Sequence, residues 1–245
     1  MTLRRPAGLG RTLPTAKEFA HACRRQRRVL LSPRVAAAIW RFSVNASLTA
    51  KRFVDIMGAT AGIVALGPLL LGTAVAIRLE SPGPVFFRQV RVGKRGKPFV
   101  MYKFRSMFMD AEERLAELMR SNESKDGVIF KMRADPRITR VGRVIRRLSI
   151  DELPQLLNVL RGEMSIVGPR PALPAEVAQY DPMARKRLQA KPGLTCLWQI
   201  SGRSNLAFNE QIDLDLRYLQ KKSLGKDIEI IARTVPAVIS GKGAY

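Results

Sequence analysis

Two adjacent carboxylates, Asp151 and Glu152, are the side chains of this sequence best placed to do chemistry. They stand at the start of a predicted helix, with Arg146 just upstream and Arg170 between two prolines downstream. A helix N-terminus and nearby arginines together favour the binding of a phosphate group. A carboxylate held there stays ionised and could attack the phosphorus of a bound diphosphate, forming an acyl-phosphate. The pattern permits such covalent chemistry without singling it out.

A simpler interpretation of the same residues is helix capping. Ser149 and Glu152 have the spacing of a capping box, and Asp151 could itself be the N-cap. Alternatively, two carboxylates beside a diphosphate suit Mg²⁺, which prefers oxygen ligands and would shield the negative charge between nucleophile and phosphate. The residues alone leave capping, metal binding and nucleophilic attack open.

The composition points to an anionic partner. The 245 residues carry a formal charge of +23, and residues 1–52 hold 12 Lys or Arg and one acid. Nucleic acid, phosphorylated small molecules and an anionic membrane surface would all fit such a charge. The one histidine, His21, lies in the basic N-terminal part, which excludes a His-based triad. Two distant cysteines, Cys23 and Cys196, exclude a disulfide framework or zinc cluster.

One long apolar stretch, residues 56–77, contains no charged side chain. As a helix it would measure roughly 33 Å, enough to cross a bilayer core of roughly 30 Å. However, Gly67 and Pro68 lie at its midpoint, where proline removes a backbone donor and bends a helix. Basic residues flank both ends, and an equal charge on both sides favours neither crossing direction. A spanning helix and a re-entrant hairpin are both left open.

The remaining pattern predicts an α+β fold that is predominantly helical. Residues 85–92 and 98–104 are rich in β-forming side chains and flank a hairpin turn. A short extended segment is predicted at 165–167, and a turn with a strand at 191–198. Helices are predicted at 109–121, 138–148, 151–160, 174–189 with an interruption at Pro182, 205–222 and 227–240.

Several longer motifs identify a family resemblance. They occupy residues 51–55 (Lys51, Arg52 and Asp55), 81–93, 102–107, 148–155, 158–162, 164–171, 191–195 and 198–203. Together they resemble the bacterial sugar transferases, the monotopic polyprenyl-phosphate phosphoglycosyltransferases that start exopolysaccharide repeat units. The resemblance covers residues 50–241.

The resemblance implies roles for individual residues. Asp151 would attack the sugar-linked phosphate of a UDP-sugar, release UMP and hold the phosphosugar covalently until polyprenyl (undecaprenyl) phosphate collects it. Glu152 would pair with Asp151 and help it to hold Mg²⁺. The positions near the bound phosphate would be Lys103, Arg146 and Arg170, with Pro169 and Pro171 fixing the loop that presents Arg170. Lys103 also alternates with Arg105 along a predicted strand, so a solvated face is the alternative for it.

The resemblance also implies an organisation. Residues 1–47 would form a basic arm, residues 48–80 a re-entrant membrane helix broken at Gly67 and Pro68, and residues 81–245 a small catalytic domain with interfacial amphipathic helices. The domain would lie on the cytoplasmic face of the bacterial inner membrane. Galactose or glucose is the expected sugar, a homodimer is possible, and no nucleic acid is expected, because the chain lacks a recognition-helix or RNA-binding signature. A membrane-tethered nucleic-acid module and a spanning glycosyltransferase without a covalent intermediate are the alternatives.

Overall fold

The computed structural model describes residues 32–118, 132, 134–203, 206–241 and 243. The chain divides into two compact units, Met1–Phe53 and Val54–Tyr245. In the first unit the described residues lie mostly in helix α2 (Pro33–Ala65), which continues into the second unit. Most of the predicted basic arm lies outside the described residues, and its residues 33–47 are helical. The cavity described below belongs to the second unit.

The apolar stretch forms two helices instead of one. Helix α2 ends at Ala65, Leu66 lies between the helices, and α3 (Gly67–Glu80) has Pro68 in its first turn, where no helical donor is lost. Among the described residues, no single helix is both long and apolar enough to cross a membrane. Residues 37–65 and 67–80 meet that criterion only as a pair, bent by 61°. The predicted break beside Gly67 and Pro68 is confirmed, and the re-entrant path stays a prediction.

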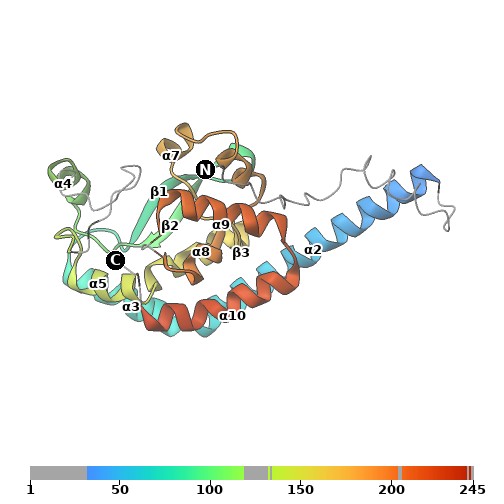
Figure 1. Ribbon diagram of the computed structural model, residues 1–245. Helices are drawn as coiled ribbons and strands as arrows, with labels where there is room; N and C mark the ends of the chain where they lie inside the picture. Colours follow the sequence, from blue (N-terminus) through green and yellow to red (C-terminus); the bar gives the residue numbers. More distant parts are fainter. Residues whose placement is uncertain (1–31, 119–131, 133, 204–205, 242, 244–245) are drawn as a thin grey trace. The chain divides into compact units, whose positions relative to one another are not determined.

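Two small sheets are present in the second unit (Figure 1). Strands β1 (Phe86–Val92) and β2 (Pro98–Phe104) form the predicted antiparallel hairpin, with Phe86 opposite Phe104. Their turn includes the short 3₁₀ helix η1 (Lys94–Gly96), in which Arg95 adopts a left-handed conformation. Strands β3 (Ser165–Val167) and β4 (Gly193–Thr195) pair in parallel, so the chain between them makes a crossover.

The helices follow the predicted order with two local differences. The predicted helix 151–160 is a 3₁₀ helix, η3 (Ile150–Gln155), followed by α6 (Leu156–Arg161); Pro154 lies inside η3. The predicted helix 174–189 is interrupted around Pro182, as expected, and a short helix at 197–200 was not predicted. The other helical elements are α4 (Ala111–Leu118), α5 (Arg140–Arg147), α7 (Pro174–Ala178), η4 (Ala184–Gln189), α8 (Leu197–Ile200), α9 (Phe208–Gln220) and α10 (Leu224–Ser240).

Two hydrophobic clusters fix the position of η3. In one, Ala59 of α2 packs with buried residues of β2 and α6, including Met101 and Val159. In the other, Ile77 of α3 packs against Phe104 at the end of β2 and Ile145 of α5. Burying each large apolar side chain contributes about 1.5–3 kcal/mol. Because η3 connects α5 to α6, these clusters hold it against β2.

Asp55, the acid of the motif 51–55, is a buried structural residue. Its Oδ1 accepts hydrogen bonds from Ser165 Oγ at 2.9 Å and from the backbone N–H of Ile166 at 3.0 Å. These bonds fasten α2 to the first residues of β3. Asp55 therefore joins the apolar stretch to the rest of the second unit, which is a physical reason for an acid so close to apolar residues.

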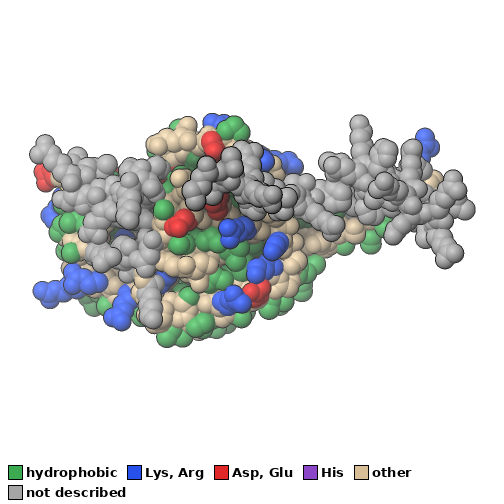
Figure 2. Space-filling view, viewed as in Figure 1, with side chains coloured by type: hydrophobic (Ala, Val, Ile, Leu, Met, Phe, Trp, Pro, Cys, Tyr) green, Lys and Arg blue, Asp and Glu red, His purple; other side chains and the backbone are tan. Residues whose placement is uncertain are grey.

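Large hydrophobic side chains remain exposed on α3 and α10. Leu71 and Leu79 of α3 are 68% and 82% exposed, and Ile239 of α10 is 72% exposed. Figure 2 shows hydrophobic side chains along the lower edge of the face in view, with basic side chains beside them. This combination is typical of a helix surface that contacts lipid and anionic headgroups.

Candidate active site

A cavity of about 760 Å³ lies beside η3. Asp151 and Glu152 are part of its wall, together with the three predicted phosphate-binding cations, Lys103, Arg146 and Arg170. Lys103 comes from β2, Arg146 from the last turn of α5, and Arg170 from the loop that follows β3. Thus the fold brings side chains that are as far apart in the sequence as Lys103 and Arg170 to one site.

The start of η3 has a different geometry from a capped helix. Ser149 adopts a left-handed conformation with φ of 54°, and its side chain makes no capping hydrogen bond. Instead Ser149 Oγ accepts a hydrogen bond from Arg203, and the Glu152 carboxylate bonds to Lys103. The capping-box interpretation is therefore wrong. The turn at Ser149 places both carboxylates of η3 on the cavity wall instead of against the helix end.

The two carboxylates have different surroundings. Lys103 Nζ lies 2.8 Å from Glu152 Oε1, whereas the Asp151 side chain makes no ion pair with any described residue. Burial raises the pKa of Asp151 to about 6, opposed by Lys103 and reinforced by the charge of Glu152. Burial also acts to raise the pKa of Glu152, but the Lys103 ammonium outweighs it and the pKa is lowered. At neutral pH both are ionised, and Asp151 is the more basic.

The loop 169–171 presents Arg170 to the cavity. Arg170 Nη1 lies 3.4 Å from Glu176 Oε1, and its guanidinium lies over the Trp198 ring at 5.9 Å from the ring centre. Pro171 also contributes to the cavity wall, but Pro169 does not. The structure therefore places Arg170 and Pro171 at the cavity, as expected for a loop that presents a cation to a phosphate.

Two buried donors in the cavity wall are not among the predicted phosphate-binding residues. Arg203 is 7% exposed and lines the cavity, but its Nη1 has no hydrogen-bond partner among the described residues. The same holds for Nε1 of Trp198. A buried donor without a partner costs about 1–3 kcal/mol, so both are suited to an acceptor from a ligand. Both belong to the motif 198–203, in which the sequence favours packing or interface anchoring over substrate contact for Trp198 and predicts no role for Arg203.

Several aromatic side chains also line the cavity. Phe86 stacks on Phe104 with ring centres 5.4 Å apart, whereas Phe87 pairs across the hairpin with Lys103, on the other face of the two strands. Phe86, Phe87 and Phe108 are each more than a third exposed. A cavity lined by cations, carboxylates and aromatic rings suits a ligand that has an anionic group and an apolar part.

The predicted hairpin residues lie away from this cavity. Lys51 and Arg52 are half-buried in α2 and belong to the first unit. Gly67 and Pro68 begin α3, and none of these four residues lines the cavity. Their predicted role concerns the membrane segment and not the chemistry.

Magnesium fits the carboxylate pair in its donor chemistry. Asp151 is free of ion pairs among the described residues and lines the cavity next to Glu152. Mg²⁺ is usually held by one or two carboxylates, with substrate phosphate oxygens and water completing its shell. No cluster of three or more potential ligand side chains occurs among the described residues. The two acids thus match a metal site that is completed by a phosphorylated substrate.

The cavity combines two adjacent carboxylates with three cations, an arrangement suited to a phosphorylated ligand. Comparison with known proteins identifies the family. Residues 46–241 match the model of the family described as "Bacterial sugar transferase", and the chain belongs to this family. The resemblance inferred from the motifs is confirmed, and with it the transferase class.

Three relatives illustrate the similarity. The chain is 45% identical over 205 residues to "Galactosyl transferase CpsE" of Streptococcus agalactiae, which covers 83% of this chain and 45% of that protein. It is 41% identical to "Exopolysaccharide production protein ExoY" of Sinorhizobium fredii, and the match covers 80% of this chain and 88% of that protein. It is 43% identical to "UDP-glucose:undecaprenyl-phosphate glucose-1-phosphate transferase" of Caulobacter vibrioides, and the match covers 80% of this chain and 72% of that protein. The chain thus spans less than half of the first relative and most of the other two.

Proposed function

We propose that the protein transfers a phosphosugar from a UDP-sugar to polyprenyl phosphate through a covalent intermediate on Asp151. The observation that carries the proposal is the asymmetry of the carboxylate pair. Glu152 is engaged by Lys103 at 2.8 Å, while Asp151 faces the cavity without an ion pair among the described residues. The names of several relatives describe transfer of a sugar phosphate to undecaprenyl phosphate, which supports the lipid acceptor.

In the first step a carboxylate oxygen of Asp151 attacks the phosphorus that carries the sugar. The bond between this phosphorus and the bridging oxygen breaks, and UMP leaves with the electron pair. The product is an acyl-phosphate that links Asp151 to the sugar phosphate. The raised pKa of Asp151 makes the carboxylate more basic, and it remains mostly ionised at neutral pH. Lys103, Arg146 and Arg170 balance the negative charge of the diphosphate.

In the second step a phosphate oxygen of the polyprenyl phosphate attacks the same phosphorus. The bond to Asp151 breaks, the carboxylate is restored, and a polyprenyl-diphosphate sugar is formed. Both nucleophiles are already anions, so neither step requires a proton to be removed. This agrees with a sequence whose one histidine, His21, lies far from residue 151 in the chain.

Mg²⁺ belongs to the same proposal. Asp151 and Glu152 would hold the ion together with substrate oxygens, and the ion would neutralise charge on the diphosphate. Glu152 is the better-suited permanent ligand, because its lowered pKa keeps it ionised whether or not Asp151 carries the phosphosugar.

The membrane is the source of the acceptor. We propose that the apolar stretch 56–77 enters the cytoplasmic leaflet as a re-entrant hairpin bent at Leu66, with residues 81–245 on the cytoplasmic face. The bend of 61° and the exposed apolar side chains of α3 support this arrangement. A hairpin would hold the cavity and its aromatic side chains near the lipid, where the isoprenoid of the acceptor lies.

The covalent intermediate is directly testable by mass spectrometry. Incubating the purified protein with a UDP-sugar and no acceptor should add the mass of a phosphosugar to the peptide that contains Asp151, with release of one UMP. The relatives' names include galactose, glucose and N-acetylgalactosamine, so UDP-activated forms of all three should be tried. Asp151→Asn should form no adduct and release no UMP. Full turnover by this variant would exclude the covalent mechanism.

A further inference from the structure

The loop that carries Arg170 is held through its carbonyl groups. Pro169 and Pro171 have no N–H, so the loop has few backbone donors of its own. All three of its carbonyl oxygens accept hydrogen bonds. The N–H of Gly193 donates to Pro169 O at 2.8 Å, Arg187 Nη2 donates to Arg170 O at 3.3 Å, and Arg91 Nη1 donates to Pro171 O at 2.9 Å.

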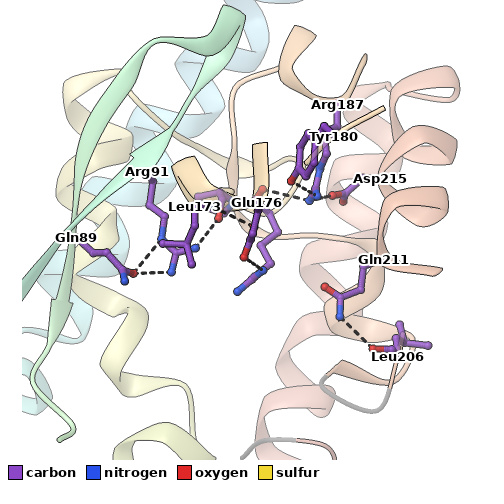
Figure 3. A network of polar contacts seen from close by, with 11 residues as sticks. Gln89, Arg91, Leu173, Glu176, Tyr180, Arg187, Leu206, Gln211 and Asp215 are labelled. Carbon is purple, nitrogen blue, oxygen red and sulfur yellow. Dashed lines mark hydrogen bonds and ion pairs between the residues drawn. The ribbon is translucent and has the colours of Figure 1, made fainter. Parts of the chain in front are cut away.

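Two of these three donors are buried arginine side chains. Arg187 is 3% exposed and Arg91 is 8% exposed. Arg187 forms an ion pair with Asp215 of α9, which is fully buried, and also donates to Tyr180 Oη at 2.8 Å. Arg91 is oriented by Gln89, whose Oε1 accepts from Arg91 Nε at 3.0 Å. Figure 3 shows Arg187 between Tyr180 and Asp215, and Arg91 beside Gln89.

The guanidinium of Arg170 is restrained separately. Its partner Glu176 is only 2% exposed, and the second carboxylate oxygen of Glu176 accepts the N–H of Leu173 at 3.1 Å. The backbone and the side chain of Arg170 are therefore fixed by different groups. This is more restraint than an exposed loop arginine needs for solubility or packing.

The Arg187–Asp215 pair is a weak source of stability. Burial raises the pKa of Asp215 to about 6, against the opposing effects of Arg187 and of the backbone N–H of Arg170. Burial lowers the pKa of Arg187, but the Asp215 carboxylate more than reverses this, and the pKa is raised. Removing two charges from water costs roughly what their attraction returns, so a buried pair contributes little net stability. A role in geometry is the better explanation.

We propose that the buried Arg187–Asp215 pair is a positioning device for Arg170. Asp215 orients Arg187, Arg187 holds the carbonyl of Arg170, and the Arg170 guanidinium is thereby kept on the cavity wall. The inference rests on the proposed function, because it takes Arg170 to bind the diphosphate of the donor. It assigns a role to Asp215, which as a sequence feature is an ordinary helix charge.

The test replaces both members of the pair, Arg187→Met with Asp215→Leu. Removing both avoids leaving one buried charge alone, and such replacements are often neutral for stability. We expect the unfolding temperature to stay within about 5 °C of wild type. The single-turnover rate of UMP release should fall about tenfold to hundredfold, because a small displacement of a binding group is costly. Arg185→Met, an exposed change in the same helix η4, should retain the wild-type rate.

Combining the double variant with Arg170→Met distinguishes a positioning role of the pair from a general disruption of the fold. If the pair acts through Arg170, adding Arg170→Met to the double variant should lower UMP release no further than Arg170→Met alone. The inference would be overturned if the fold-decreases in UMP release of the double variant and of Arg170→Met multiplied in the triple variant. A wild-type rate in the double variant would overturn it as well. Failure of the wild-type protein to release UMP would instead contradict the proposed function.

A second variant covers the case in which the double variant does not fold. Arg187→Lys keeps the charge opposite Asp215 but has no planar fork, so it cannot bond Asp215, Tyr180 and the Arg170 carbonyl together. We expect a folded protein with slower UMP release and the same coupling to Arg170→Met. A wild-type rate in Arg187→Lys would contradict the positioning role.

Discussion

The ammonium group of Lys103 lies 2.8 Å from the carboxylate of Glu152 and forms no ion pair with the neighbouring Asp151. Strand β2 and the 3₁₀ helix η3 pack together, so this bond crosses from one element to the other. One acid of the pair is thereby committed to a cation, and the other faces the cavity. The division of roles between two adjacent carboxylates follows from this single contact.

Replacing Lys103 should abolish the difference in role between Asp151 and Glu152. In Lys103→Met, Glu152 loses the cation that lowers its pKa, and the two adjacent acids then compete for a proton. We expect adduct formation on Asp151 to slow about 100-fold. The measurement is the rate of UMP release in a single turnover. Lys97→Met removes an exposed lysine just before the same strand and should react at the wild-type rate. Equal rates in the two variants would contradict the role of Lys103.

The buried indole N–H of Trp198 in α8 should contribute to binding of the UDP-sugar. Trp198→Phe removes the unpaired Nε1–H and keeps most of the ring beside Arg170. Losing one hydrogen bond to a charged phosphate costs about 1.5–3 kcal/mol, so kcat/KM for UMP release should fall about 10- to 100-fold. Leu206→Met, a change outside the cavity wall, serves as the control. An unchanged kcat/KM in Trp198→Phe would show that the indole N–H does not meet the substrate.

Local patterns were sufficient to predict most elements of the second unit. The β-forming side chains of residues 85–92 and 98–104 and the turn between them predicted the hairpin, and Gly67 with Pro68 predicted the break between α2 and α3. The order of the helices was also correct. Proline explains the main local error: Pro154 has no N–H, and residues 150–155 form a 3₁₀ helix rather than the start of an α-helix.

Features that depend on burial could not be predicted in this way. Asp215 has the spacing of an ordinary helix charge, and only the folded chain shows that it is buried against Arg187. Likewise, the capping spacing of Ser149 and Glu152 is a local signal that was overruled by two distant partners, Arg203 and Lys103. Contacts between residues about 50 positions apart decide the chemistry of this site, and local spacing carries no information about them.

The ion pair between Asp135 and Arg137 makes a prediction for stability and pH. Both side chains are buried, and Arg137 Nη2 lies 2.6 Å from Asp135 Oδ2. Burial acts to raise the pKa of Asp135, but the hydrogen bonds from Arg137 lower it below its usual 3.8. The stabilisation is complete above pH 3.8 and is lost as the pH falls through the lowered value. Asp135→Asn should therefore destabilise the protein by about 3 kcal/mol at pH 5–7.

Thermal unfolding of the two proteins at several pH values checks this. The difference in stability between wild type and Asp135→Asn should be constant from pH 5 to 7 and should shrink below about pH 4. Asp110→Asn is the matched control, because its pair with Arg114 is largely exposed and should contribute about 0.5 kcal/mol or less. A difference in stability between wild type and Asp135→Asn that increases at low pH would contradict a stabilising role of this ion pair.

The bend at Leu66 predicts which side of the membrane each flank of the apolar stretch occupies. Single cysteines at Asn45 and at Lys97, both exposed, would report the two flanks after Cys23→Ser. Cys196 can remain, because its thiol is buried and burial raises its pKa well above 9.0, which makes it unreactive. A membrane-impermeant maleimide should label both positions in inverted membrane vesicles and neither in intact spheroplasts.

Pro68→Leu tests whether Pro68 causes the bend that keeps both flanks on one side of the membrane. It restores a backbone donor and removes the steric block to a continuous helix across residues 56–77. A straight helix of roughly 33 Å can cross a bilayer core of roughly 30 Å. We expect part of the Pro68→Leu protein to expose one of the two cysteines on the opposite side, with a matching loss of UMP release, because residues 81–245 then lie on the wrong side or are strained. Opposite-side labelling already in the parent would show that the segment spans the membrane and would exclude the re-entrant hairpin.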